Sequence, residues 1–252
     1  MSKRNLFFWL PNFITAMNLI SGCMAVFMGI EGELGLAAVF ILAASVFDFM
    51  DGLAARLLRS YSEIGKQLDS LADLVSFGVA PAAILWSMLE RSLFGGNVSF
   101  AETQGTPLQW VLLVSVILVP AAGAFRLAKF NIDTRQSESF LGLPIPANAM
   151  FYASLAFVLE FGKSEAVNHL LLNPFFIAAV IVAFPCLMIS EIPMFSLKVK
   201  DLSWRGNQLR FSFLALCLVL ILIFQLYALP LIIISYIVMS LFKRPQTADR
   251  KA

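Results

Sequence analysis

The sequence predicts an all-α integral membrane protein with eight transmembrane spans in total. Of its 252 residues, 60% are apolar and 13% are charged, about half the charged fraction of an average soluble domain. Such a chain lacks the charge needed to cover a water-facing surface, so we expect lipid around most of it. The apolar residues also gather in runs of roughly 20, the length that crosses ~30 Å of hydrocarbon. A net charge of +2 does not suggest a nucleic-acid partner.

The expected spans follow these runs along the chain. By residue number they are 8–30, 34–56, 67–90, 107–126, 146–162, 173–190, 210–226 and 229–243. The first run follows a basic N-terminus without a small-residue cleavage signal, so we expect it to be retained as a span. The sixth run offers Asn173 as an N-cap and Pro174 at the first helical position. Residues 211–242 carry no charge, which allows one very long helix or two short ones turning near Pro230.

Charge placement decides between seven and eight spans. With a cytoplasmic N-terminus and eight spans, 16 of the 18 lysines and arginines lie inside, as the positive-inside rule expects. Only Arg91 and Lys163 then lie outside. Seven spans would leave the basic tail outside. The inside residues are Lys3, Arg4, Arg56, Arg59, Lys66, Arg126, Lys129, Arg135, Lys198, Lys200, Arg205, Arg210, Lys243, Arg244, Arg250 and Lys251.

The longest polar cytoplasmic segment, residues 191–209, separates six spans from the last two. We therefore expect residues 1–190 to form a six-helix core. Residues 210–252 should add a pair of transmembrane helices and a basic cytoplasmic tail.

Four aspartates interrupt the apolar pattern at the expected cytoplasmic ends of the second and third spans. Asp48 and Asp51 are three residues apart, and Asp69 and Asp73 are four apart, so each pair lies on one helix face. A short loop joins the two helices and makes them antiparallel neighbours, so the pairs can converge on one pocket. The alternative is that these aspartates are interfacial caps, with one Asp–Arg pair of structural importance.

The energetics of this cluster indicate a metal site. A carboxylate at membrane depth costs about 2.5–3.5 kcal/mol, and four together repel one another. Arg56 is a single positive group and cannot neutralise four. Divalent metal can, and carboxylates without histidine or thiolate favour hard ions such as Mg²⁺ or Mn²⁺. Because magnesium completes its shell with water and substrate phosphates, the implied substrate is a phosphate or diphosphate.

The spacing around these aspartates resembles the signature of the CDP-alcohol phosphatidyltransferase family. The chain fills every position of that signature with Asp48-x2-Asp51-Gly52-x2-Ala55-Arg56-x8-Gly65-x3-Asp69-x3-Asp73. The pattern fixes eight residues over 26 positions, and the resemblance covers about the first 190 residues. It implies a six-helix core, with the last two helices outside it.

The resemblance also implies a role for each position. Asp73 would help to hold a second ion and act as general base on the incoming alcohol. Two Mg²⁺ or Mn²⁺ ions are expected. The expected metal ligands are Asp48, Asp51, Asp69 and Asp73. The residues expected to receive the cytidine diphosphate group are Gly52, Ala55, Arg56 and Gly65. Small residues let a nucleotide approach the backbone, and Arg56 can pair with phosphate in a fork geometry.

Flanking segments resemble the serine-using branch of the family, the phosphatidylserine synthases. They are Asp69-Ser-Leu-Ala-Asp73-Leu-Val-Ser-Phe-Gly78-Val-Ala-Pro81-Ala, Phe125-Arg126-Leu-Ala-Lys129-Phe130-Asn131, Phe140-Leu-Gly142-Leu-Pro144-Ile-Pro146-Ala and Leu187-Met188-Ile-Ser190 running on to Lys198. The sequence departs from that branch at Asn148, where a small residue is expected, and at Lys129, where arginine is commoner. The resemblance implies transfer of the phosphatidyl group from CDP-diacylglycerol to the hydroxyl of L-serine, giving phosphatidylserine and CMP by metal-assisted direct displacement.

Basic residues at the end of the fourth span offer an anion site. Arg126 and Lys129 can bind a serine carboxylate or a lipid phosphate. The alternative is that they are snorkelling side chains that anchor the helix.

Polar residues in the first span belong to a Pro-Asn-x-x-Thr segment, which is similar to one that the family places near the nucleotide. On that basis Asn12, Thr15 and Asn18 are expected near the cytidine diphosphate. Helix capping explains Asn12 equally well, whereas a buried amide at Asn18 needs a partner.

Other functions remain open at this level. A sibling enzyme can use glycerol phosphate or inositol phosphate with the same site. An intramembrane prenyltransferase also binds diphosphate through aspartate-held magnesium, but its two motifs lie far apart in sequence. A cation channel or transporter would need polar residues along a whole path, and the outer halves of these spans are almost entirely apolar.

The expected partners are CDP-diacylglycerol, L-serine and membrane lipid, and the resemblance implies a homodimer. We expect a multi-pass protein of a bacterial inner (cytoplasmic) membrane. Both termini and the active site should lie on the cytoplasmic side.

Overall fold

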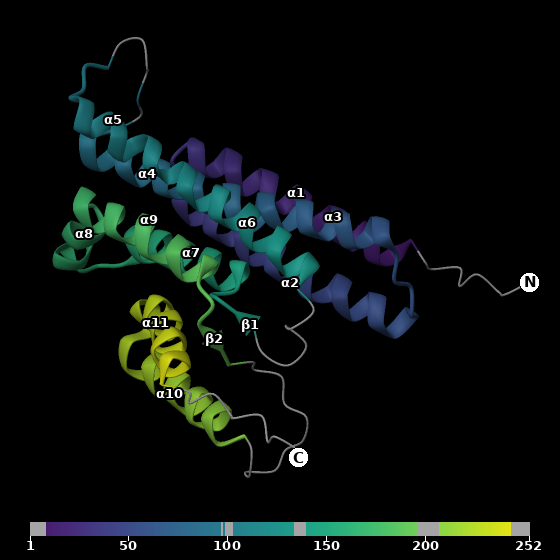
Figure 1. Ribbon diagram of the computed structural model, residues 1–252. Coiled ribbons are helices and arrows are strands. Elements are labelled where there is room, and N and C mark those ends of the chain that lie inside the picture. The colour runs from purple at the N-terminus through teal and green to yellow at the C-terminus, as the bar shows by residue number, and fades with distance from the viewer. Residues whose placement is uncertain (1–8, 97, 99–102, 134–139, 196–206, 243–252) are drawn as a thin grey trace, which may run out of the picture.

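The computed structural model describes residues 9–96, 98, 103–133, 140–195 and 207–242. Helices dominate these residues (Figure 1). The α-helices are α1 (Leu10–Ile30), α2 (Leu34–Leu58), α3 (Glu63–Leu74), α4 (Ala80–Phe94), α5 (Pro107–Val114), α6 (Leu118–Ile132), α7 (Ile145–Phe161), α8 (Glu165–Leu171), α9 (Pro174–Ile189), α10 (Gln208–Phe224) and α11 (Ala228–Leu241). Short turns of other helix types are η1 (Val75–Val79), η2 (Ser115–Ile117) and η3 (Gln225–Tyr227), and two strands are β1 (Phe140–Leu141) and β2 (Pro193–Met194).

The predicted all-α membrane fold is confirmed for the described residues. Five helical segments are long and apolar enough to span a bilayer, and α8 with α9, bent by 59°, makes a sixth if the two count as one span. Helix α7 is apolar but shorter. Large apolar side chains such as Phe27, Phe49 and Leu222 lie on the surface, where a membrane protein meets lipid. The count of eight spans remains a prediction.

Several expected helix boundaries shift in the structure. The third span was expected at 67–90, but one helical segment runs from Glu63 to Phe94 with the π-helical turn η1 inside it. The fourth extends to Ile132 instead of 126. Asn173 caps α9 as predicted, because its side chain accepts hydrogen bonds from the backbone N–H groups of Phe175 and Phe176. Helix α8, just before it, was not predicted.

The expected inside charges are only partly described. Lys3, Arg4, Arg135, Lys198, Lys200, Arg205, Lys243, Arg244, Arg250 and Lys251 lie outside the described residues, as do most of the loop 191–209 and the tail.

The C-terminal pair is a helical hairpin and not one long helix. The rings of Phe213 in α10 and Tyr236 in α11 lie 6.0 Å apart, which requires the two helices to pack side by side in antiparallel directions. The turn is η3, Gln225–Tyr227, where the Gln225 backbone has a positive φ of 50°. It lies a few residues before Pro230, next to the predicted break between residues 226 and 229. Proline is accommodated in the first turn of α11, where its missing N–H costs nothing.

This hairpin rests on α7 and β2 (Figure 1). The Tyr236 hydroxyl donates to the carbonyl of Phe195, 3.0 Å away, just after β2. Strand β2 pairs with β1 in antiparallel fashion, an element that the sequence did not predict. The added helices are thereby tied to the segment that leads into α7.

The core bundle positions the aspartates through close packing of α1. Helix α1 packs against α2, α3, η1 and α4, and α2 packs against α7. Gly22 of α1 lies directly against Ser76 in η1, where an added Cβ would be 2.2 Å from the Ser76 Oγ and 2.8 Å from its Cα. Ser76 in turn donates a hydrogen bond of 3.0 Å to the Asn18 carbonyl. Because η1 begins two residues after Asp73 of α3, this contact sets the distance between α1 and that aspartate.

We therefore expect Gly22→Ala to destabilise the protein by about 1–3 kcal/mol, as overpacking of a tight contact does. The Ser76 backbone is part of the clash, so rotation of the serine side chain cannot relieve it. Thermal melting in detergent checks this, with Gly96→Ala as the control, because an added Cβ at Gly96 meets nothing within 4 Å. Equal melting temperatures for the two variants would contradict this account of the α1–η1 contact.

Candidate active site

Three of the four aspartates form a compact cluster. One carboxylate oxygen each from Asp48, Asp51 and Asp69 lies within 4.8 Å of the others. The first two come from the second half of α2 and the third from the middle of α3, so carboxylates of the two helices converge as predicted. Asp51 is 5% exposed, and the other two are half-buried.

Asp73 lies outside this cluster and has its own partner. It is buried, and its Oδ1 accepts a hydrogen bond of 3.2 Å from the Asn18 side chain. Thr15, also in α1, donates a 2.6 Å hydrogen bond to Asp51 Oδ2. Helix α1 therefore holds one aspartate from each of the two acidic helices. The sequence had placed Thr15 and Asn18 together at the nucleotide, and the structure separates them.

The turn between the two acidic helices is short and well defined. Helix α2 ends at Leu58, and the next residue, Arg59, adopts a left-handed conformation with φ of 49°. The Ser62 side chain then caps α3 by accepting a 2.9 Å hydrogen bond from the Gly65 backbone N–H. This turn reverses the chain direction between α2 and α3, as predicted. Both helices pack on α1 and face each other through their aspartate side chains.

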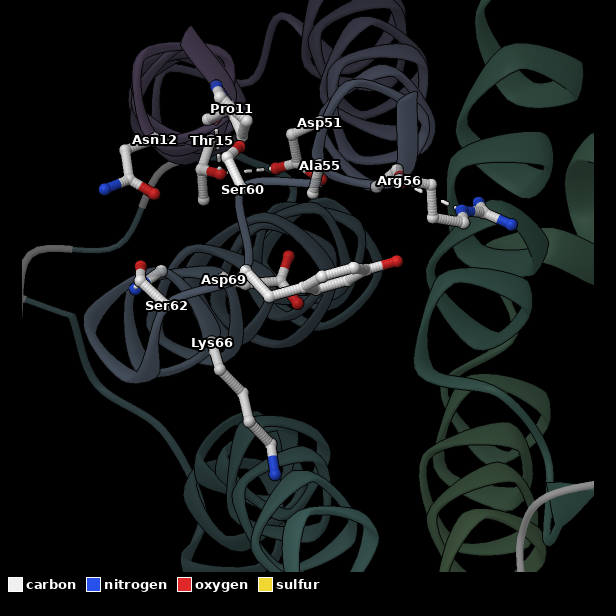
Figure 2. A pocket seen from close by; sticks show the side chains of 13 residues that line it. Pro11, Asn12, Thr15, Asp51, Ala55, Arg56, Ser60, Ser62, Lys66 and Asp69 are labelled. Carbon is white, nitrogen blue, oxygen red and sulfur yellow. Dashed lines mark hydrogen bonds between the residues drawn. The ribbon is translucent and has the colours of Figure 1, made fainter. Parts of the chain in front are cut away.

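Beside the aspartate cluster lies a cavity of about 400 Å³ (Figure 2). The residues that line it are Pro11, Asn12, Thr15, Asp51, Gly52, Ala55, Arg56, Ser60, Tyr61, Ser62, Gly65, Lys66 and Asp69. Nearly all of the residues expected at the cytidine diphosphate are among them. Asn18 is the exception. The cavity has the size of a small-molecule binding site.

The two glycines of the motif differ in what surrounds them. A Cβ at Gly65 would meet the side-chain oxygens of Asn12 and Ser62 at 2.8 and 2.9 Å, so this glycine lets α1 approach α3. A Cβ at Gly52 would meet only the mobile end of Arg56, at 3.7 Å. The room beside Gly52 is therefore not used by protein packing and faces the cavity.

Asn12, which is half-buried, and Arg56, which is exposed, both line the cavity. Helix α1 begins at Leu10, so Asn12 lies inside its first turn and does not cap it. The Arg56 Nε donates a 2.9 Å hydrogen bond to the Gly52 carbonyl, one turn earlier in the same helix. Figure 2 shows the guanidinium group directed away from Asp51 and Asp69.

Five cavity residues were missed by the sequence reasoning. They are Pro11, Ser60, Tyr61, Ser62 and Lys66. The last four fall at positions of the signature where no residue type is fixed. A usable signal was present at Lys66, a basic residue next to Gly65.

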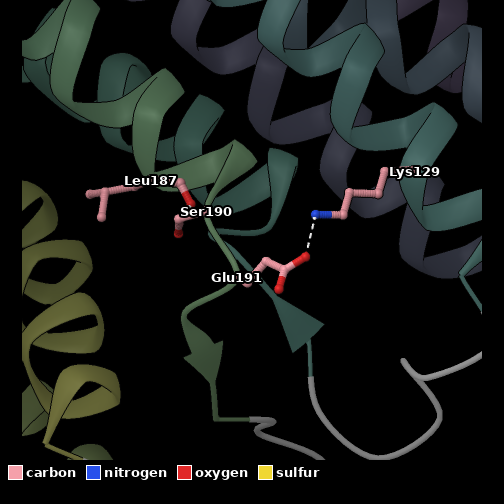
Figure 3. Close-up of polar contacts among 4 residues, drawn as sticks. All are labelled: Lys129, Leu187, Ser190 and Glu191. Atoms are coloured by element: carbon pink, nitrogen blue, oxygen red, sulfur yellow. Dashed lines mark hydrogen bonds and ion pairs between the residues drawn. The ribbon is translucent and has the colours of Figure 1, made fainter.

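Arg126 and Lys129 differ in their surroundings. Arg126 is 8% exposed and buried in the bundle, so it does not snorkel to the surface. Lys129 forms an ion pair of 3.0 Å with Glu191, which follows α9 (Figure 3). Both residues border a second cavity of about 80 Å³ between α6 and the end of α9. Arg126 and Asp73 lie near enough for the Asp73 charge to act on the Arg126 guanidinium.

Comparison with known proteins supports the family resemblance. A family model described as CDP-alcohol phosphatidyltransferase matches residues 8–241. A CDP-diacylglycerol–serine O-phosphatidyltransferase of Bacillus subtilis is 31% identical over 184 residues, which are 73% of this chain and 88% of the relative. The enzyme of the same name from Mycobacterium leprae is 33% identical over 193 residues, 73% of this chain and 57% of the relative. An archaetidylserine synthase of Methanothermobacter thermautotrophicus is 30% identical over 188 residues, covering 74% and 69%.

Proposed function

Because the chain belongs to the CDP-alcohol phosphatidyltransferase family, we propose that it transfers the phosphatidyl group from CDP-diacylglycerol to the hydroxyl of L-serine. The products are phosphatidylserine and CMP. The observation that carries this proposal is the aspartate cluster beside a nucleotide-sized cavity, built from the residues of the family signature. The matched region is 57% of the Mycobacterium leprae relative's length and 88% of the Bacillus subtilis relative's.

The aspartate cluster fits a divalent metal. Three carboxylates within 4.8 Å of one another repel unless a cation lies among them. No lysine or arginine among the described residues forms an ion pair with them. An all-oxygen set of this kind suits Mg²⁺ or Mn²⁺. Asp48, Asp51 and Asp69 would hold one ion. Asp73 would help to hold a second.

When bound, such ions offset negative charge on a diphosphate and on the departing phosphate. The cavity would take the cytidine diphosphate head. Gly52 leaves room at the cavity wall. The one described hydrogen bond of the Arg56 side chain is to the Gly52 carbonyl of its own helix. The Arg56 guanidinium can therefore rotate toward a bound phosphate. Lys66 also lines the cavity, and its Nζ donates a 3.2 Å hydrogen bond to the Asn131 carbonyl of α6. These residues bind and orient the nucleotide, and the diacylglycerol tails extend into lipid.

Asp73 is suited to the role of general base. Asn18 holds its Oδ1, so Oδ2 is the oxygen that would accept the proton of the serine hydroxyl. The serine oxygen forms a bond to the phosphorus of the phosphatidyl group, and the bond from that phosphorus to the oxygen of the CMP phosphate breaks. The electron pair leaves with CMP. No covalent intermediate with the protein is required.

The names of the relatives share serine as the acceptor, whereas the lipids in those names differ. Two are named for CDP-diacylglycerol and serine, and the third for archaetidylserine. A phosphorylated acceptor such as glycerol phosphate would need a cluster of free cations. Lys129 is already paired with Glu191, and Arg126 is the one basic residue buried within the described part of the chain.

An acceptor screen tests the proposal. Protein purified in detergent should release CMP from CDP-diacylglycerol only when serine and Mg²⁺ or Mn²⁺ are both present. Glycerol phosphate and inositol phosphate, offered separately at equal concentration, should give release no faster than water. Equal release with glycerol phosphate would overturn serine as the acceptor while keeping the reaction class.

We also propose that the site faces the cytoplasm and that the protein forms a homodimer. The aspartates lie at the same ends of their helices as Arg56, Arg59 and Lys66, and positive residues favour the cytoplasmic side. Labelling of a cysteine introduced at Tyr61 in inverted vesicles checks the orientation. The mass of the protein in detergent, measured by light scattering, checks the dimer.

A further inference from the structure

Asn148, in the first turn of α7, is a buried amide without a protein partner. It is 0% exposed, and within the described residues neither its side-chain nitrogen nor its oxygen has a hydrogen-bond partner. Buried amides are nearly always hydrogen-bonded, because leaving both groups unpaired costs free energy. The sequence departs from the expected small residue at this same position. A polar ligand would account for an amide placed there.

Helix packing places Asn148 at the depth of the aspartates. Helices α2 and α7 run antiparallel, since the Phe161 ring near the end of α7 lies against Gly35 near the start of α2. Phe161 lies 13 residues after Asn148, and Asp48 lies 13 residues after Gly35. Each residue advances a helix by about 1.5 Å. Asn148 and Asp48 are therefore at about the same level in the bundle.

Arg126 is the second buried group with an unused donor. Its Nε has no hydrogen-bond partner among the described residues. Gly123, three residues earlier in α6, lies against Ile145, three residues before Asn148 in α7. Residues three apart share a helix face, so Arg126 and Asn148 lie on the facing sides of α6 and α7.

The two side chains also lean toward one another. Helical side chains tilt toward the N-terminus of their own helix. The first residues of α6 lie at the end of the bundle that is remote from the aspartates. The first residues of α7 lie at the end that is nearer to the aspartates. Arg126 thus leans away from the end of the bundle nearer to the aspartates, and Asn148 leans toward that end. Their polar groups come to a common level, and the Asp73 charge reaches Arg126 there.

We propose that Arg126 and Asn148 together recognise the amino-acid head of the acceptor. The Arg126 guanidinium donates to the carboxylate, and the Asn148 side-chain oxygen accepts from the ammonium group. One buried cation matches one carboxylate, and the neutral amide matches an ammonium without repelling it. The hydroxyl is then held toward Asp73. This inference rests on the proposed function, in which serine is the acceptor.

The test compares serine with two analogues that each lack one charged group, 3-hydroxypropionate without the ammonium and ethanolamine without the carboxylate. The variants are Asn148→Ala and Arg126→Ala. The control is Asn168→Ala in α8, whose side-chain oxygen is also unpartnered within the described chain but lies at the opposite end of α7 from the aspartates. Initial rates of CMP release give KM for each acceptor and for CDP-diacylglycerol.

We expect Asn148→Ala to raise the KM for serine about tenfold to a hundredfold, the usual effect of losing a hydrogen bond to a charged group. The KM for CDP-diacylglycerol and the melting temperature should change little. The preference for serine over 3-hydroxypropionate should shrink in this variant. The preference for serine over ethanolamine should shrink in Arg126→Ala. Asn168→Ala should behave as the wild type.

The outcomes separate the inference from the function on which it rests. A serine KM in Asn148→Ala within about twofold of the wild type would overturn the inference. So would an equal loss of rate with all acceptors together with a lower melting temperature, since that pattern reports a structural role. A wild-type protein that uses another alcohol and not serine would overturn the proposed function itself.

Discussion

Replacing Asp73 with asparagine should reduce phosphatidyl transfer by about 10²- to 10⁴-fold, the contribution of a positioned general base. Asparagine keeps the shape and can still accept the hydrogen bond from Asn18 through its side-chain oxygen. It cannot take a proton from the serine hydroxyl. The loss should appear in kcat, measured by CMP release at saturating serine and CDP-diacylglycerol.

Binding of CDP-diacylglycerol should survive this change. Asp73 lies outside the set of residues that line the 400 Å³ cavity, so equilibrium binding of the radiolabelled lipid should stay close to that of the wild type. Glu63→Gln, an exposed neutralising change in the first turn of the same helix α3, is the matched control. Turnover by Asp73→Asn within about tenfold of the wild type would remove Asp73 from the role of base.

Removal of divalent metal should have the other large effect. A chelator should stop CMP release, and added Mg²⁺ or Mn²⁺ should restore it. Asp69→Asn should raise the Mn²⁺ concentration for half-maximal activity by about tenfold or more, because ligand charge sets the affinity of such sites. Asp69 is the most informative of the three to change, since Asp51 is also held by Thr15.

A readout independent of turnover comes from thermal melting without substrate. Neutralising one of three carboxylates within 4.8 Å of one another relieves repulsion, so metal-free Asp69→Asn should be more stable than the metal-free wild type by on the order of 1–3 kcal/mol. The variant should then gain less from Mn²⁺. Glu31→Gln, an exposed change after the far end of α1, should leave both properties unchanged. If the wild type melts at the same temperature with and without Mn²⁺, the cluster does not bind the ion.

The prediction of the fold succeeded where composition and length are sufficient. Apolar runs located α1, α2, α7 and α9 to within a few residues, and Asn173 with Pro174 marked the start of α9. The prediction was incomplete where local backbone conformation decides how a helix bends or ends. The π-helical turn η1 and the turn at Gln225 leave no mark in an apolar sequence, because their cause is packing against neighbouring helices.

The sequence by itself determined that the chain is a membrane protein and that two pairs of aspartates each share one face of two consecutive helices. Both follow from local physics, since hydrophobic length and helical spacing need no distant contact. Only the tertiary structure gave Asp73 a partner apart from the other three, because Asn18 of α1 donates a hydrogen bond to Asp73 while Thr15 of α1 donates one to Asp51. Only the tertiary structure, too, placed Asn148 of α7 opposite Arg126 of α6, because a group's hydrogen-bond partners depend on which helices surround it.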